Sequence, residues 1–446
     1  MTSAEDESLG QVVQLLVSAG ARRILAKPLA ANDNSKNQVY LGGDFGVLNV
    51  LPAGAPEPKS SGSHDKPIFE AHLNLSWLGP DGLFHPAPHA KLILYPQYPE
   101  VRFSGFLLGC EQGPSALMGT TRVPGRLLLL GICDEGRILG WVGSPDGTAN
   151  QEFQALSAQD RFERIGVFHS IPIPGTEGES DRAALLSELR RIHGKGWIES
   201  KRLSSTGGSL PCLSQKCGGL TLEAELGITP IGYSEPDYRG WEVKQHAVAN
   251  FVGMSSGPIT LMTPEPTGGV YVEKGVIPFI QEYGYPDTRG RTDRRNFGGV
   301  HRAGETCKKT GLTLTLLGYD HATGHITDPG GGIALIDGHD TQAAMWHYSG
   351  LMAHWNRKHA SAAYLPSMMR TEPHREYKYG PSARLGVGTD FLKFLSAVNS
   401  GEVYYDPGIK AESWSHNPVV KRRSQFRIKS KGIAALYDEV TTISLL

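Results

Sequence analysis

Residues 236–244 read Pro-Asp-Tyr-Arg-Gly-Trp-Glu-Val-Lys and join a turn to the start of a strand. The apolar positions within residues 241–248 predict a β-strand, whose side chains point alternately to its two faces. Glu242 and Lys244 are two positions apart, so we expect a carboxylate and an ammonium side by side on one face. Any fold of this chain must therefore contain a strand that presents both of these charged groups on the same face.

Asp237 lies just before this strand, on the other side of the Arg239-Gly240 pair. A bend at that pair would return the Asp237 carboxylate to Glu242. Two carboxylates about one metal diameter apart can hold Mg²⁺ through hard oxygen ligands. Lys244 can then orient a water or offset charge on a phosphate. The segment therefore predicts hydrolysis of a phosphodiester bond.

The Glu-x-Lys triplet alone is a weak signal, because it also occurs at residues 57–59, 199–201 and 376–378. None of those copies follows a Pro-Asp pair. The alternative for Glu242 and Lys244 is a solvated strand face with a salt bridge, which is a common surface feature.

Residues 217–228 predict a glycine turn followed by a short helix that Gly227 can end. Leu222 and Leu226 are four apart and form its apolar stripe. Glu223 is next to this stripe, a placement that suits a carboxylate aimed at a site beside the strand. An ordinary acid on a helix surface is the alternative.

Residues 218–244, "GGLTLEAELGI…PDYRGWEVK", resemble the MvaI/BcnI restriction endonucleases. These are relatives of the mismatch-repair nicking enzyme MutH within the PD-(D/E)xK nuclease superfamily. The resemblance implies an α/β (α+β) nuclease domain with a mixed central sheet. It implies Asp237 and Glu242 as ligands of Mg²⁺ and Lys244 as the catalytic lysine, with Glu223 as the family's helix acid.

Composition sets broad limits on the chain. Its 446 residues suggest two or three domains, and its 55 glycines and 29 prolines favour a loop-rich α/β or β architecture. The net charge is −1, so DNA binding must come from local basic clusters. The five cysteines suggest no disulfide framework and fit a reducing cytosol. We therefore expect a cytoplasmic protein, with no apolar run that spans a membrane.

The first part of the chain predicts a helix over residues 9–19 and then many short strands, typical of a small barrel or pseudobarrel. The strands are expected near residues 23–29, 38–41, 68–75, 91–95, 102–108, 126–132 and 138–142.

A polar insert interrupts this strand-rich part, and its amides could pair with adenine in a major groove. The insert comprises Asn32, Asp33, Asn34, Lys36, Asn37 and Gln38. A plain surface turn is the alternative. Residues 24–41 are similar to the entry loop of the EcoRII-type effector domain, and residues 89–106, with Arg102, resemble its second arm. The resemblance implies an all-β-rich DNA-binding pseudobarrel over residues 1–172.

Residues 173–182 predict a linker, so that residues 183–446 form the nuclease domain. Strands are expected at 259–262, 312–317, 333–336 and 403–405, and helices at 180–193, 341–355 and 390–398. A glycine-rich loop suits phosphate binding or is simply solvated, and it carries Arg289, Arg291, Arg294 and Arg295. A strand over residues 421–429 would present Arg423, Gln425 and Arg427 on one face to DNA.

These observations predict a Mg²⁺-dependent type II restriction endonuclease, a monomer, that cuts double-stranded DNA. The resemblance implies a CCWGG-like target, a second DNA copy bound by the first domain as effector, and a cognate DNA methyltransferase as partner. Two alternatives stay open. One is a modification-dependent or repair nicking endonuclease, and the other is a non-catalytic DNA-binding regulator.

Overall fold

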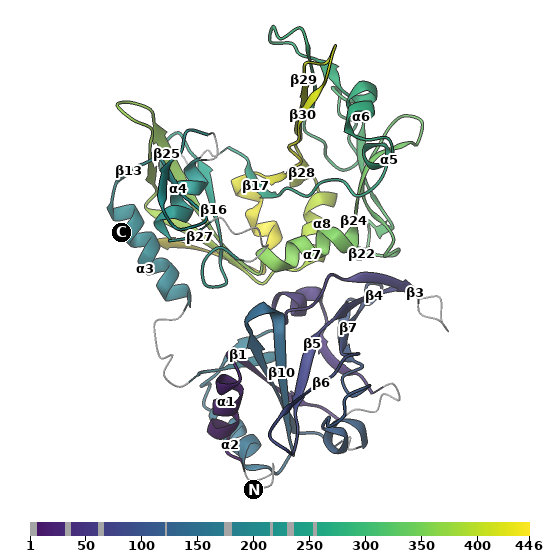
Figure 1. Cartoon of the computed structure of the whole chain (residues 1–446), viewed down its shortest axis with the longest axis vertical. Coiled ribbons are helices and arrows are strands. Elements are labelled where there is room, and N and C mark those ends of the chain that lie inside the picture. Colours follow the sequence, from purple (N-terminus) through teal and green to yellow (C-terminus); the bar gives the residue numbers. More distant parts are fainter. Residues whose placement is uncertain are drawn as a thin grey trace. The chain divides into compact units, whose positions relative to one another are not determined.

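A computed structural model describes residues 7–31, 37–60, 67–120, 123–173, 181–214, 217–229, 236–252 and 257–446. The chain is a mixed α/β protein rich in strands, as predicted, and divides into two compact units, Met1–Gly178 and Glu179–Leu446 (Figure 1). Most of the predicted linker, residues 174–180, lies outside the described residues. Within the described residues, no helix has the length and apolar character needed to cross a membrane.

The first unit contains two sheets in its described part. The seven-stranded sheet has the order β11 (Glu163–Ile165), β12 (Phe168–Ile171), β1 (Ala21–Leu29), β9 (Arg126–Cys133), β10 (Arg137–Gly143), β5 (Asn74–Leu78), β6 (Phe84–Pro86). The five-stranded sheet has the order β2 (Val39–Gly42), β8 (Glu100–Ser104), β7 (Lys91–Tyr95), β4 (Pro67–His72), β3 (Glu57–Ser60). The chain changes sheet between β4 and β5, where only Leu73 separates the two strands.

The core of the first unit lies between its larger sheet and two helices, α1 (Leu9–Ser18) and α2 (Thr148–Ser157). Ser8 begins α1 with a capping box, in which its hydroxyl accepts from the Gln11 amide and the Gln11 side chain accepts from the Ser8 amide. The helix buries Leu9, Val12, Val13 and Leu16. This amphipathic pattern is why the sequence predicted the helix to within one residue.

The second unit is built on a six-stranded sheet that carries the predicted catalytic strand. Its described strands run β13 (Trp197–Glu199), β26 (Glu376–Tyr379), β25 (Ser361–Arg370), β27 (Ser382–Val387), β32 (Glu439–Ser444), and β16 (Glu242–Ala247) pairs in parallel with β25. Helices α3 (Asp181–Gly194) and α4 (Cys217–Glu225) pack against one face, in a shared apolar core with Val243, Ala363 and Leu385.

The rest of the second unit is a set of small sheets and helices. The described sheets are β17 (Ile259–Met262) with β31 (Phe426–Ile428) and β28 (Val403–Tyr405); β18 (Tyr285–Pro286) with β19 (Arg294–Gly298), β29 (Gly408–Glu412) and β30 (Val419–Lys421); β20 (Thr313–Leu317) with β23 (Gly332–Ile336) and β24 (Gln342–His347); and the pairs β14 (Lys201–Leu203) with β15 (Ser209–Pro211) and β21 (Tyr319–Asp320) with β22 (His325–Ile326). The helices are α5 (Val270–Glu273), α6 (Val276–Tyr283), α7 (Tyr348–Lys358) and α8 (Phe391–Asn399).

Two predicted elements are wrong in part. The helix expected over residues 341–355 begins only at Tyr348, because residues 342–347 pair with β23 as strand β24. Four successive residues of β24 are buried, and a buried apolar run does not distinguish a strand from a helix. The strand expected over residues 421–429 is split between β30 and β31, which belong to different sheets.

The cysteines also differ from the prediction, because Cys212 and Cys217 form a disulfide. Cys212 follows β15 and Cys217 is the first residue of α4, and their Cα atoms are 5.7 Å apart. Among the described cysteines, Cys110, Cys133 and Cys307 are free. The cysteine pattern therefore no longer argues for a reducing compartment.

Candidate active site

A tight turn returns Asp237 to the start of β16, as the sequence predicted. Tyr238 and Trp241 form an antiparallel bridge, with N–H···O distances of 2.9 and 2.8 Å. The two residues between them, Arg239 and Gly240, have φ angles of 44° and 80°, the left-handed values that a two-residue hairpin turn needs. The reversed chain lets the Asp237 Oδ2 accept a hydrogen bond of 2.9 Å from the Val243 amide.

Glu242 and Lys244 lie on one face of β16, and Lys244 Nζ donates to Glu242 Oε1. The side chain of Glu242 is 2% exposed and that of Lys244 is 20% exposed. The second oxygen of Glu242, Oε2, is buried and has no hydrogen-bond partner among the described residues. A buried carboxylate oxygen without a partner is costly unless a cation or another donor reaches it.

Burial and neighbouring charges shift the pKa values of Asp237 and Lys244. Burial, followed by the negative charge of Glu242, raises the pKa of Asp237 to about 7. Burial alone would lower the pKa of Lys244, but the surrounding carboxylates, chiefly Glu242, hold that pKa above its ordinary value. The lysine is therefore a fixed positive charge, and Asp237 is a carboxyl whose ionisation a further cation would favour.

Glu223 of α4 belongs to the same electrostatic group. Its side chain is partly buried, and burial raises its pKa. The charge of Lys244 opposes that shift, while the charge of Glu242 adds to it. The structure therefore brings together all four residues that the sequence proposed for catalysis: Glu223, Asp237, Glu242 and Lys244.

The carboxylate oxygens of Asp237 and Glu242 are suited to a hard divalent cation that keeps part of its hydration shell. The described residues contain no group of three or more His, Cys, Asp or Glu arranged to hold a metal. Mg²⁺ needs no such cage, because it binds through one or two carboxylates together with waters and substrate phosphate. The unpartnered Oε2 of Glu242 and the crowded carboxyl of Asp237 are suited to that role.

Three further residues near the site were missed by the sequence analysis. Tyr364, opposite Lys244 on β25, shares a 2.9 Å hydroxyl–hydroxyl hydrogen bond with Tyr437, and both phenols lie in the field of Glu242. Glu225, on α4, is buried and paired with three cations. An acid among leucines in "LTLEAEL" was the available signal for Glu225. The tyrosines come from distant segments and gave none.

The profile of the MvaI/BcnI restriction endonuclease family matches residues 186–437, which is more than half of the 446 residues. The chain belongs to the MvaI/BcnI restriction endonuclease family. It is therefore a DNA nuclease of the restriction type. The match contains α4, the turn at Asp237 and strand β16.

Solved structures similar to this restriction endonuclease include two of MvaI. One is MvaI in a complex with its cognate DNA substrate, at a TM-score of 0.44 and 17% identity, covering 60% of this chain and 100% of that chain. The other is MvaI without DNA, at a TM-score of 0.33 and 18% identity, covering 60% of this chain and 99% of that one. Comparison with curated proteins gave no match.

The polar insert of the first unit is described only at its end. Asn32, Asp33, Asn34 and Lys36 lie outside the described residues, whereas Asn37 and Gln38 are described. Gln38 is buried and its side-chain oxygen accepts from Arg102 Nη1 at 3.4 Å. These two side chains help line a cavity of about 490 Å³, together with Lys27 and Tyr40. Asn37 is the residue before Gln38 in the chain.

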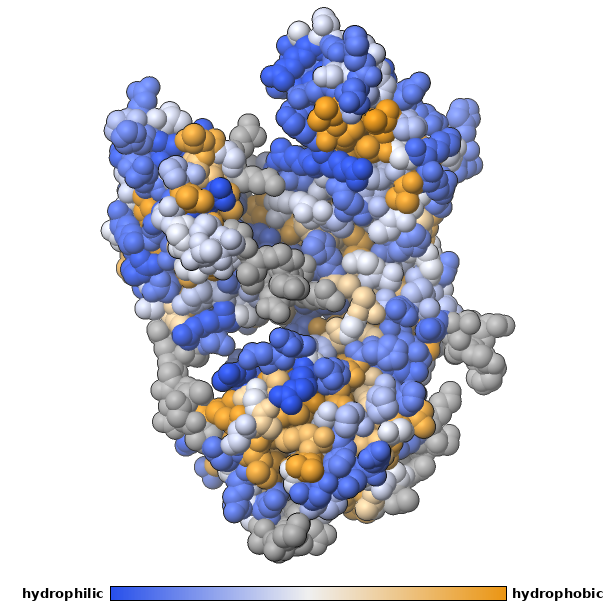
Figure 2. Space-filling view, in the orientation of Figure 1, coloured by the Kyte–Doolittle hydropathy of each residue, from blue (hydrophilic) through white to orange (hydrophobic). Residues whose placement is uncertain are grey.

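The arginines of the predicted phosphate-binding loop fall into two groups. Arg289 and Arg291 are exposed between β18 and β19, and Arg291 pairs with Glu412 at 3.5 Å. Arg294 and Arg295 lie on β19 and are half-buried; Arg294 pairs with Asp287, and Arg295 lies 5.4 Å from the ring of Trp414. Figure 2 shows mostly hydrophilic residues at the end of the molecule where β29 and β30 lie, with an apolar patch beside them.

The three residues predicted to share a strand face are not equivalent. Arg423 is exposed, and Gln425 is buried with 4% exposure in the segment between β30 and β31. Arg427 lies on β31, where its Nη1 donates to Asp406 at 2.6 Å. The single DNA-facing ribbon is therefore not present, because the chain leaves one sheet and enters another at this point.

Proposed function

We propose that this restriction endonuclease is a Mg²⁺-dependent type II enzyme whose site is formed by Asp237, Glu242 and Lys244. The observation that carries the proposal is the hairpin turn that returns Asp237 to β16, beside a buried Glu242 oxygen without a partner. Together these two carboxylates would hold the cation, within a PD-(D/E)xK nuclease fold built on the six-stranded sheet.

The reaction is hydrolysis of the scissile phosphodiester by water. A bound Mg²⁺ supplies Lewis-acid stabilisation of the negative charge that develops on the phosphate. The Lys244 ammonium, oriented by Glu242 Oε1, donates hydrogen bonds to the attacking water or to a phosphate oxygen. Because the pKa of Lys244 is raised, this residue acts as a donor and an electrostatic stabiliser rather than as a base.

For the first unit we propose an effector pseudobarrel that binds a second copy of the target site. Support comes from the cavity beside β2 and β8, which is lined by Lys27, Gln38, Tyr40 and Arg102. The target is proposed to be CCWGG-like, and a cognate DNA methyltransferase would protect the host DNA at that site. We propose that the enzyme is a monomer and acts in the cytoplasm, where that DNA lies.

Digestion of an unmodified, sequenced plasmid with Mg²⁺ tests the catalytic proposal. Lys244→Ala and Glu242→Ala are expected to abolish cutting while retaining DNA binding in a gel-shift assay. Lys378→Ala is the matched control, since it removes the lysine of another Glu-x-Lys triplet on the same sheet and should cut normally. Discrete double-strand products would exclude a nicking or modification-dependent enzyme. Failure of the unaltered protein to cut with Mg²⁺ or Mn²⁺ would favour a DNA-binding regulator.

Addition of a site-bearing oligonucleotide tests the effector proposal in the full chain. The oligonucleotide should stimulate plasmid cleavage by the unaltered protein, and Arg102→Ala should reduce that stimulation. The basal cleavage rate should stay the same, because Arg102 lies in the other unit. Equal stimulation in both proteins would count against an effector site at this cavity.

A further inference from the structure

Helix α4 carries two acids that face in different directions. Positions 218, 221 and 225 are separated by three and four residues, so they share one face of the nine-residue helix. Glu223 is two positions from both Thr221 and Glu225, which places it roughly 200° around the axis, on the opposite side. Glu223 lies in the field of Lys244 and Glu242, whereas Glu225 pairs with cations that follow or belong to other elements, such as Arg191 of α3.

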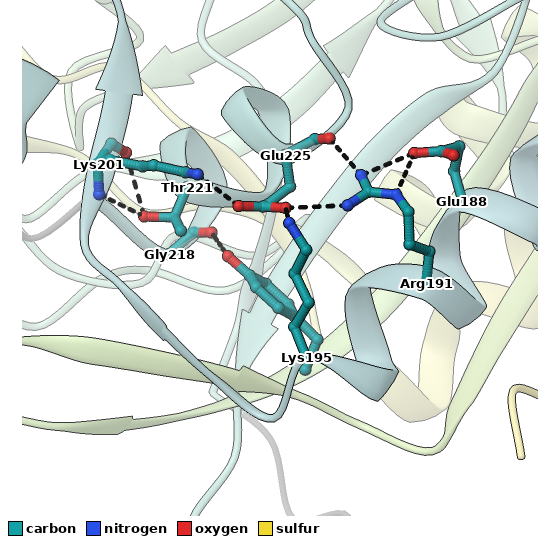
Figure 3. A network of polar contacts seen from close by, with 8 residues as sticks. Glu188, Arg191, Lys195, Lys201, Gly218, Thr221 and Glu225 are labelled. Atoms are coloured by element: carbon teal, nitrogen blue, oxygen red, sulfur yellow. Dashed lines mark hydrogen bonds and ion pairs between the residues drawn. The ribbon is translucent and has the colours of Figure 1, made fainter. Parts of the chain in front are cut away.

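Glu225 is a buried acid at the centre of a polar network whose cations, Arg191, Lys195 and Lys201, are partly exposed (Figure 3). Its Oε1 receives Lys201 Nζ at 2.5 Å, and its Oε2 receives Lys195 Nζ at 2.7 Å and Arg191 Nη1 at 3.4 Å. Arg191 Nη2 also donates to the backbone carbonyl of Glu225 at 2.7 Å. The Glu225 side chain is 2% exposed.

The charge of Glu225 is maintained despite this burial. Burial would raise the pKa of the carboxyl, but hydrogen bonds and charges from Lys195 and Lys201 hold the pKa below its ordinary value. The three cations come from two parts of the chain, since Arg191 lies in the last turn of α3, Lys195 directly follows that helix, and Lys201 begins β14. The ionised Glu225 therefore joins α4 to both.

Further contacts fix the same face of α4. The Thr221 hydroxyl accepts from the Lys201 amide and donates to the Lys201 carbonyl, both at 3.1 Å. The Tyr379 hydroxyl donates to the Gly218 carbonyl at 2.7 Å. All of these contacts limit rotation of α4 about its own axis. Rotation is the motion that would carry the Glu223 carboxylate away from Lys244.

We propose that Glu225 is a positioning residue of the nuclease site, which acts by holding the rotation of α4 and thereby the carboxylate of Glu223. The inference rests on the proposed function, with Glu223 as a further catalytic member of the group formed by Asp237, Glu242 and Lys244. A buried ion pair is weak evidence for stability, because apolar residues can replace it. Three cations that converge on one carboxylate instead define the orientation of α4. Small displacements of a catalytic group slow a reaction by on the order of 100-fold.

Steady-state cleavage kinetics with Glu225→Gln and Glu223→Gln, alone and combined, test this role. Glu225→Gln is expected to lower kcat about 10-fold or more, with an unchanged KM for DNA, because a side chain that is 2% exposed offers almost no surface to the substrate. Glu223→Gln should then add nothing in the Glu225→Gln background, since both changes remove the same aligned carboxylate. Glu188→Gln is the matched control: it removes another carboxylate partner of Arg191 and is expected to leave both parameters unchanged.

All rates are compared well below each variant's measured unfolding midpoint. If Glu225→Gln does not fold, Lys195→Gln replaces it in the same cycle, because it leaves Glu225 paired with Arg191 and Lys201. Independent, multiplicative effects of the two changes on kcat would overturn the inference. So would a change confined to KM or to its salt dependence, which would mark these cations as a DNA contact. Full activity of Lys244→Ala would instead overturn the proposed catalytic group itself.

Discussion

Asp237→Asn is expected to make the metal-free enzyme more stable while abolishing cleavage. Burial of the Asp237 carboxyl, followed by the negative charge of Glu242, raises its pKa in the folded protein from 3.8 to about 7. Between these two values the folded carboxyl keeps a proton that the unfolded chain has lost. The free energy of unfolding of the wild-type protein therefore falls as the pH rises from 3.8 to about 7.

The size of this effect follows from the shift of about three pKa units. At ~1.4 kcal/mol per unit, ionised Asp237 lowers the free energy of unfolding by up to about 4 kcal/mol above pH 7. Asparagine carries no charge, and its carbonyl oxygen can still accept from the Val243 amide. The free energy of unfolding of the variant should therefore be higher than that of the wild type by a few kcal/mol at pH 8 and equal to it near pH 4.

Urea unfolding of both proteins in EDTA, at pH 4 and pH 8, measures this difference. Asp340→Asn, an exposed acid of the same unit, is the control and should leave stability unchanged at both pH values. Addition of Mg²⁺ should stabilise the wild type and not Asp237→Asn, so that the difference in their free energies of unfolding becomes smaller. A variant that is less stable than the wild type at pH 8 would refute the reasoning, because it would mean that burial and the charge of Glu242 do not destabilise ionised Asp237.

Three further outcomes are expected. Burial lowers the pKa of His246 from 6.5 to about 4, so the free energy of unfolding of the wild type should fall by on the order of 3 kcal/mol as the pH falls from 6.5 to 4. In acid unfolding curves, the free energy of unfolding of His246→Phe should fall by less over the same pH range. Cys212→Ser should lower the free energy of unfolding by about 2 kcal/mol in urea, a difference that dithiothreitol should remove. Glu412→Gln removes a carboxylate shared by four basic side chains, so gel shifts at low salt should show tighter DNA binding.

Local pattern predicted the parts of the site that are close in sequence. The apolar run at 241–248 predicted β16, and the Arg239-Gly240 pair predicted the turn that returns Asp237. The helix with Glu223 was also expected, because Leu222 and Leu226 give it an apolar stripe. In each case the interactions that fix the element lie within a few residues, so periodicity and turn chemistry were sufficient.

What the sequence did not reveal depends on distant partners. The role of Glu225 needs Arg191, some 34 residues earlier, and the Tyr364–Tyr437 contact joins residues 73 apart. The strand β24 was taken for a helix because burial on both faces removes the alternation that marks a strand. The segment before β31 was mistaken for a continuous strand because nothing local marks a change of sheet.

The central claim is that Asp237 and Glu242 together hold a divalent cation. Crystals of the enzyme soaked in Mn²⁺ test it directly, because the anomalous scattering of manganese locates the ion. The account predicts a peak at bonding distance from both carboxylates, with Lys244 beside it, and its loss in Asp237→Asn. A peak bound elsewhere, or none at these carboxylates in an enzyme that still needs the metal to cut DNA, would contradict the account.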